Sequence, residues 1–224
     1  QTGGSNVAIG VDALEDNTAS NNTAVGHNSL KENTTGTRNT AVGTFALDAN
    51  TTASENSAFG YNALTDNTTG TYNTAIGREA LANNTTADSN TAVGNSALTT
   101  NITGASNTAV GSYALGNNIA SNNTSVGFSA LISNTTGTNN VAVGANALDA
   151  NTTGQQNIAI GAHALSGVTT GDFNTAVGHE ALFANTTATH NTAVGRHALV
   201  SNTTGADNTA VGSGALDAVT TGSF

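Results

Sequence analysis

The chain has 224 residues and a net charge of −10, with four basic residues and no Pro, Cys, Met or Trp. So few Lys and Arg side chains argue against nucleic acid or an anionic membrane as a partner, because these side chains neutralise phosphates. With 8% charged and 4% aromatic residues, the chain either is disordered or needs a fold with a thin core. No apolar run approaches the ~20 residues of a transmembrane helix, so no membrane insertion is expected.

From Asn6 onward, a repeat of about 17 residues occurs thirteen times, as in residues 39–55, NTAVGTFALDANTTASE. We number positions within a repeat from its first Asn. Position 1 is always Asn, position 5 always Gly and position 9 always Leu, and position 3 is Ala except at Ser125. Two repeats lack one residue in the same turn, at Ala19-Ser20-Asn21 and Ala120-Ser121-Asn122, which marks a loop between regular elements.

Each repeat is predicted to hold two short strands, one of them at positions 2–4, such as residues 40–42. β-branched residues at positions 2 and 4 fit a pleated strand, whereas the density of Gly, Thr and Asn disfavours helix. No Asn-Gly or Asp-Gly pair occurs, so hairpins are not expected. The pattern predicts an all-β, parallel β-solenoid of thirteen roughly 17-residue coils, with residues 1–224 as one domain. Disorder is the alternative, but it does not hold apolar residues at fixed spacing.

The invariant residues of the repeat have expected structural roles. Val42 and Leu47, with their equivalents in the other repeats, are predicted to form apolar columns, and Gly43 is predicted to allow a backbone turn. Asn39 and Asn50, with their equivalents, are predicted to form two ladders of stacked amides. The predicted structural ladder comprises Asn39, Asn56, Asn73, Gly43, Gly60, Gly77, Leu47, Leu64 and Leu81. The recurrent Ala at position 3 indicates close packing, either within the coil or against another chain, so the predicted assembly face comprises Ala41, Ala58 and Ala75.

The variable positions are where a site could lie. His163, Glu180 and His197 fall in one column of successive coils, with His179 adjacent, and could bind a divalent metal. The interpretation we favour is a solvated turn in which these side chains stack, so no metal or other cofactor is expected. The carboxylates are scattered singly through turns, so no enzymatic activity is predicted. The alternating column Glu15, Lys31, Asp48 is interpreted as a solvated surface.

Two further surfaces could bind ligands. The Thr pair at positions 13 and 14, as at Thr51-Thr52, could form a hydroxyl array of the type that binds ice. Replacement of the first Thr by Ile102 and Ile119 indicates that it points inward, which leaves one outward column, interrupted by Ala19 and Ala120. Aromatic side chains in variable positions are candidate glycan platforms or contacts between chains: Phe45, Tyr61, Tyr72, Tyr113, Phe128, Phe173 and Phe183. Contact between chains is preferred for Tyr72, Phe173 and Phe224, which share one turn column.

The NTAVG segments and the variants at residues 6–10 and 140–144 resemble the head repeats of trimeric autotransporter adhesins. They are still more similar to NTAVG-x-x-AL-x-x-NTTG arrays of bacterial and phage tail-fibre-type proteins. The resemblance covers essentially the whole chain, although adhesin heads use a shorter coil. It implies a left-handed β-roll, three chains assembled through small-residue faces, and an extracellular fibre or adhesin.

We therefore expect a structural fibre, filament or adhesin-shaft protein, extracellular or at the cell surface, whose partners are other copies of itself in a trimer or an end-to-end polymer. The alternative is a binding module for ice or a surface glycan displayed on the same solenoid. Because the first and last residues both align with the closing turn of a repeat, a complete filament subunit and a fragment of a longer fibre are equally expected.

Overall fold

The computed structural model describes residues 3–223, and all regular secondary structure within them is β. The chain divides into an N-terminal unit, Gln1–Ser112, and a C-terminal unit, Tyr113–Phe224. The expectations for the first two residues of the opening turn and for the aromatic side chain of Phe224 fall outside the described residues.

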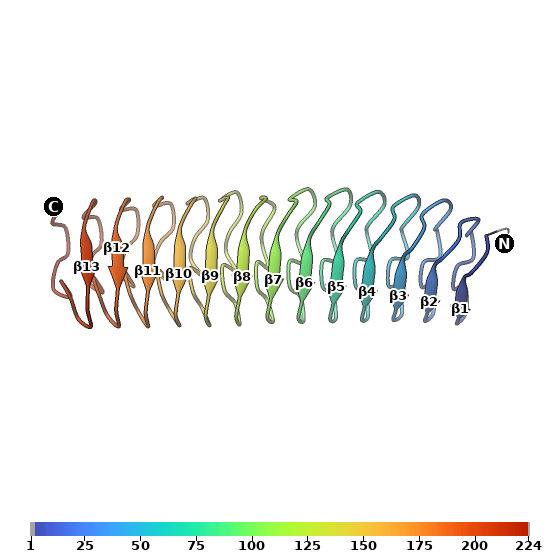
Figure 1. Ribbon diagram of the computed structural model, residues 1–224, viewed down its shortest axis with the longest axis horizontal. Helices are drawn as coiled ribbons and strands as arrows, with labels where there is room; N and C mark the ends of the chain where they lie inside the picture. The colour runs from blue at the N-terminus through green and yellow to red at the C-terminus, as the bar shows by residue number, and fades with distance from the viewer. Residues whose placement is uncertain (1–2, 224) are drawn as a thin grey trace. The chain divides into compact units, whose positions relative to one another are not determined.

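In the N-terminal unit, one strand from each coil joins a parallel sheet in chain order, as Figure 1 shows. Neighbouring strands pair in register, with Ala41 opposite Ala24 on one side and Ala58 on the other. The seven strands are β1 (Val7–Ile9), β2 (Thr23–Val25), β3 (Thr40–Val42), β4 (Ser57–Phe59), β5 (Thr74–Ile76), β6 (Thr91–Val93) and β7 (Thr108–Val110).

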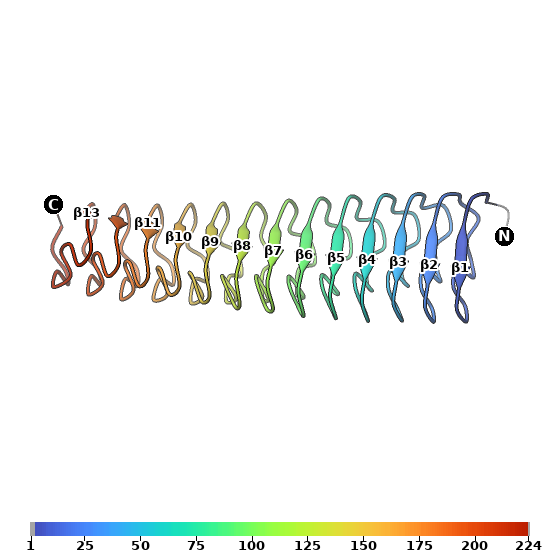
Figure 2. The same cartoon turned by 60° about the horizontal axis from the view of Figure 1, so that its bottom comes forward.

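The C-terminal unit repeats this arrangement, and Figure 2 shows its strands lying side by side from a second direction. Its sheet is also parallel and in register, as in the pairing of Ala176 with Ala159 and Ala193. Its six strands are β8 (Thr124–Val126), β9 (Val141–Val143), β10 (Ile158–Ile160), β11 (Thr175–Val177), β12 (Thr192–Val194) and β13 (Thr209–Val211). The predicted all-β parallel solenoid with coils of about 17 residues is confirmed in both units.

Each coil contributes one strand rather than the two expected. After the strand, the backbone makes two successive turns, closed by hydrogen bonds from Ala46 N–H to the Gly43 carbonyl (3.3 Å) and from Asn50 N–H to the Leu47 carbonyl (3.2 Å). Leu47 has a φ of 52°, which lies outside the β region. The Ala-Leu segment is therefore a turn. It is joined to the same segment of the next coil by a backbone hydrogen bond, such as that from the Leu47 N–H to the Ala63 carbonyl (3.1 Å).

The strands face the opposite way from the prediction. Ala41 is fully buried, whereas Val42 is only partly buried, so the expectation that Val42 lines the interior was wrong. The interior of a coil already holds fully buried Leu47, Ala46 and Asn39 side chains. A narrow interior of this kind accepts only a small side chain from the strand, Ala or in one coil Ser125, and strand alternation then places positions 2 and 4 outside.

Two columns of buried Asn side chains run between the coils. At position 1, Asn56 Oδ1 accepts the backbone N–H of Asn73 (2.9 Å), and Asn56 Nδ2 donates to the Gly70 carbonyl (2.9 Å). At position 12, Asn67 Nδ2 donates to Asn50 Oδ1 (3.1 Å) and to the same Gly70 carbonyl (3.0 Å). These amides therefore bond to one another and to backbone groups inside a core whose other side chains are mainly Ala and Leu.

Position 5 requires Gly for a reason beyond its φ of 141° at Gly43. A Cβ on Gly43 would lie 2.3 Å from the carbonyl oxygen of Gly60 in the next coil. The turn therefore needs both the glycine conformation and the space that a missing side chain leaves.

Candidate functional surfaces

The outer side of the sheet forms a regular surface in each unit. We call this the strand face and define it as positions 2 and 4 of every strand. None of its residues is buried in the single chain. In the N-terminal unit it comprises Val7, Thr23, Thr40, Ser57, Thr74, Thr91 and Thr108, beside Ile9, Val25, Val42, Phe59, Ile76, Val93 and Val110. In the C-terminal unit it comprises Thr124, Val141, Ile158, Thr175, Thr192 and Thr209, beside Val126, Val143, Ile160, Val177, Val194 and Val211.

The strand face carries no charged residue in either unit, although the chain has 18 charged residues. Its position 4 is apolar in every coil and is partly exposed or exposed throughout, with 42% of Ile76 and 40% of Ile160 accessible. A row of exposed aliphatic side chains is a candidate contact surface.

The predicted assembly face is corrected by this arrangement. Ala41, Ala58 and Ala75 are each 0% exposed in the single chain. Their invariance comes from packing inside the coil, which was one of the two explanations that the sequence left open, so they cannot form the surface that meets another chain. The strand face lies on the other side of the same three-residue strands.

The structural-ladder residues lie inside the coils. Asn39, Asn56, Asn73, Leu47, Leu64 and Leu81 are fully buried. Gly43, Gly60 and Gly77 stack at the turn, where each leaves room for the backbone of the following coil. These residues hold the coils in register and position the variable side chains in vertical columns.

The Thr pair also differs from the prediction. Ile102 is 48% exposed and Ile119 is 44% exposed, so position 13 points outward and its inward assignment was wrong. Thr51 Oγ1 at this position donates to the Thr68 carbonyl of the next coil (3.2 Å), whereas Thr52 at position 14 is exposed. The backbone turns here and is not a strand, so alternation does not apply to it.

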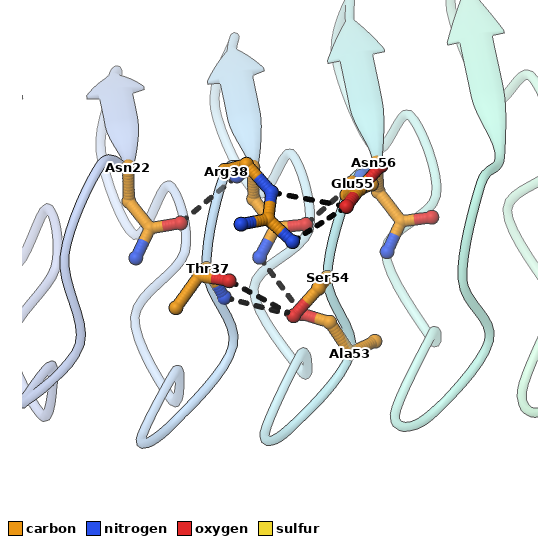
Figure 3. A network of polar contacts seen from close by, with 8 residues as sticks. Asn22, Thr37, Arg38, Ala53, Ser54, Glu55 and Asn56 are labelled. Atoms are coloured by element: carbon orange, nitrogen blue, oxygen red, sulfur yellow. Dashed lines mark hydrogen bonds and ion pairs between the residues drawn. The ribbon is translucent and has the colours of Figure 1, made fainter.

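Polar side chains at the closing turn connect successive coils, as Figure 3 shows. Arg38 Nη2 donates to Glu55 Oε1 (2.6 Å), and the Thr37 N–H donates to Ser54 Oγ (3.0 Å). The Arg38–Glu55 pair is solvent-exposed, so its contribution to stability is small.

The predicted charge column is only partly an ion-pair column. Lys31 Nζ lies 3.4 Å from a carboxylate oxygen of Glu15 and 3.9 Å from one of Asp12. The hydrogen bond and charge of Glu15 raise the pKa of Lys31 above its usual value. Asp48 instead accepts a hydrogen bond from Thr65 Oγ1 (2.6 Å). Burial raises the pKa of Asp48, with the Thr65 hydrogen bond acting in the opposite direction.

The metal candidates are rearranged relative to the sequence prediction. Ligand atoms of His179, Glu180 and His197 lie within 4.8 Å of one another. The sequence placed His163, rather than His179, in the column with Glu180 and His197. In the structure, His163 makes edge contacts with the rings of His179 (centroids 6.4 Å apart) and Phe183 (6.5 Å). The structure thus brings Glu180 and His197 together and places His163 outside this group.

The aromatic residues form short stacks along the columns of each unit. In the N-terminal unit, Phe45 lies edge-on to Tyr61 with ring centroids 6.3 Å apart. In the C-terminal unit, Phe173 stacks on His190 at 5.0 Å and remains 45% exposed. Tyr72 is 61% exposed, so it is available for the expected contact between chains.

Neither unit shows a pocket within its described residues, and those residues include no helix that could span a membrane. The fold and the columns define a β-solenoid repeat protein. No protein-family model, curated protein or solved structure matches the chain.

Proposed function

We propose that this chain is a structural protein of an extracellular fibre or adhesin shaft, and that copies of it assemble through the strand face. The observation that carries the proposal is the apolar residue at position 4 of all thirteen coils, which lies on the outside of each strand and is at least partly exposed throughout. The resemblance of the NTAVG repeats to adhesin and tail-fibre arrays supports the same function.

A second copy of the chain is the partner that fits this face best. Its strand face has the same coil spacing, so Val and Thr rows of two or three parallel copies can stay in register over many coils. The acidic chain also has no charge on this face, so copies meeting there bring no like charges into direct contact. Burial of the row removes exposed aliphatic area from water.

Sedimentation equilibrium of the full chain tests this proposal. We expect an oligomer for the natural chain and a monomer for the double variant Ile76→Glu, Val93→Glu, because buried carboxylates would repel each other across the contact. The matched control is Thr86→Glu with Thr103→Glu, which adds the same charge at exposed turn positions of the same two coils and leaves the oligomer intact. A natural chain that is monomeric at all concentrations contradicts assembly through any face.

A specific observation supports ice as a second candidate. The strand face places a Thr or Ser hydroxyl beside an aliphatic side chain in ten of the thirteen coils, counting the nine Thr and Ser57 at position 2. Rows of this kind repeat every ~4.8 Å between strands and offer methyl and hydroxyl groups to ordered water. Thermal hysteresis in a solution of monomers, lost in Thr74→Lys with Thr91→Lys, would favour ice binding over assembly.

A further inference from the structure

Three side chains of metal-ligand type converge in the C-terminal unit, outside the strand face. His197 Nε2 lies 2.9 Å from one carboxylate oxygen of Glu180, and His179 Nε2 lies 3.9 Å from the other. All three groups are half-buried or exposed, so solvent and ions reach them.

The backbone holds this group in a defined arrangement. Glu180 and His197 occupy position 7 of consecutive coils and share the same left-handed conformation, with φ of 54° and 58°. The His197 N–H donates to the His179 carbonyl (3.0 Å), and the Glu180 N–H donates to the Ala162 carbonyl of the preceding coil (3.1 Å). Identical backbone conformations on hydrogen-bonded coils direct the two side chains alongside each other.

The spacing suits a tetrahedral ion. Zn–N and Zn–O bonds of about 2.0–2.2 Å place the ligands of a tetrahedral Zn²⁺ about 3.3–3.6 Å apart. The ligand atoms here lie within 4.8 Å of one another, so small side-chain rotations bring them to that geometry. Two imidazoles with one carboxylate favour a borderline ion such as Zn²⁺ over Mg²⁺ or Ca²⁺, which prefer oxygen ligands.

We propose that His179, Glu180 and His197 form a Zn²⁺ site that joins two consecutive coils and leaves a fourth coordination position for water. The site goes beyond the structural function proposed above and does not depend on it. Binding replaces the Glu180–His197 contact, and each imidazole binds the ion through a ring nitrogen that carries no proton. The neighbouring basic side chains are His163, which contacts the His179 ring, and Arg196, which precedes His197 in the chain.

The N-terminal unit offers the same backbone arrangement with the carboxylate but without the two histidines. Glu79 has a φ of 57° and Ser96 a φ of 52°, and they occupy the places of Glu180 and His197. Arg78 stands where His179 does, and its Nη2 lies 2.8 Å from Glu79 Oε1. The two histidines are therefore what distinguishes the proposed site from an ordinary coil.

Isothermal titration of the full chain with ZnCl₂ tests the proposal, with MgCl₂ as the comparison ion. We expect about one Zn²⁺ per chain and no Mg²⁺ signal, and at least tenfold weaker Zn²⁺ binding in His197→Gln and in Glu180→Gln. His190→Gln is the matched control, because His190 lies at a closing turn and stacks on Phe173 away from the group, and it should leave the affinity unchanged. Circular dichroism verifies that each variant keeps the fold.

A gain of binding gives a second, independent readout. Arg78→His combined with Ser96→His rebuilds the ligand set around Glu79 and should raise the stoichiometry to about two Zn²⁺ per chain. Zn²⁺ binding that persists in His197→Gln, or that sedimentation shows to require two chains, overturns the proposal.

Discussion

Two Asn→Val substitutions on neighbouring coils separate the functions of the two ladders. Asn73 at position 1 accepts the backbone N–H of Asn90 (2.9 Å) through its Oδ1. Asn67 at position 12 donates to the side-chain oxygen of Asn50 (3.1 Å). Position 1 is Asn in every repeat, whereas Val168 and Val219 stand at position 12 in two.

The structure gives the expected magnitudes. Asn73→Val leaves the buried N–H of Asn90 without an acceptor, while the Ala87 carbonyl keeps its bond from Asn84 (3.0 Å). A lost hydrogen bond plus an unsatisfied buried donor costs about 2–4 kcal/mol. Asn67→Val removes the donor to Asn50 Oδ1 and the acceptor of one N–H of the Asn84 amide. Both are side-chain groups, and the added apolar burial offsets part of the loss, so the cost is about 1–3 kcal/mol.

Native-state hydrogen exchange is the suitable assay, because repeat arrays open locally and need not unfold in one step. Asn73→Val should accelerate exchange at the Asn90 amide by about one to three powers of ten, whereas Asn67→Val should change it little. Urea unfolding should rank the variants in the same order. An unchanged Asn90 amide in Asn73→Val, or equal acceleration of this amide by Asn67→Val, would refute the assignment of the position 1 side chain as a backbone acceptor.

Three further predictions concern individual columns. Gly77→Ala places a Cβ 2.5 Å from the carbonyl oxygen of Gly94 in the next coil and should lower the free energy of unfolding in urea by about 3 kcal/mol or more. In the control Gly212→Ala, the added Cβ meets nothing closer than 3.8 Å, and the loss should be about 1–2 kcal/mol. Ser96→Val should cost about 1–2 kcal/mol, because a β-branched residue is forced to a φ of 52°, while Asn95→Val should stay within about 0.5 kcal/mol. The raised pKa of Asp48 means that the folded state binds its proton more tightly than the unfolded state, so stability is lost as the pH rises through the range just above 3.8. Asp48→Asn should therefore be more stable than the natural chain in urea at pH 7 and indistinguishable from it at pH 3.

The sequence predicted the period, the parallel stacking and the Asn columns, because deletions and invariant positions recur at fixed spacing. It did not predict which side of the strand faces inward. Alternation relates Ala41 to Val42 but does not assign either to the core, and hydrophobicity alone favoured the larger Val42. The stricter signal was size, because an interior that also holds Leu47 accepts only a small side chain, Ala or Ser, at position 3.

A second signal in the sequence concerns the backbone. Positions 7, 9 and 17 carry positive φ, as at Phe45, Leu47 and Glu55. In a chain rich in Thr and Val, none of these positions holds a β-branched residue in any repeat. This exclusion is the signature of the left-handed conformation, and it would have predicted turns in place of the second strand.

The proposed metal site was only half predictable. Vertical columns placed Glu180 between His163 and His197 with equal spacing. The Glu180 carboxylate lies on the side of the following coil, 2.9 Å from His197, and the third ligand is the adjacent residue His179. The direction of a side chain along a column is a rotamer choice that sequence spacing does not specify.

Disulfide trapping between copies tests the central claim most directly, because the natural chain has no Cys. Single Cys residues are introduced as Val93→Cys on the strand face, Ala92→Cys on the buried side of the same strand, and Thr86→Cys at an exposed turn. Parallel, in-register assembly places the same strand-face residue of two copies together, so mild oxidation should give a covalent dimer for Val93→Cys alone. A dimer from Thr86→Cys but not from Val93→Cys, or from none of the three, would contradict assembly through the strand face.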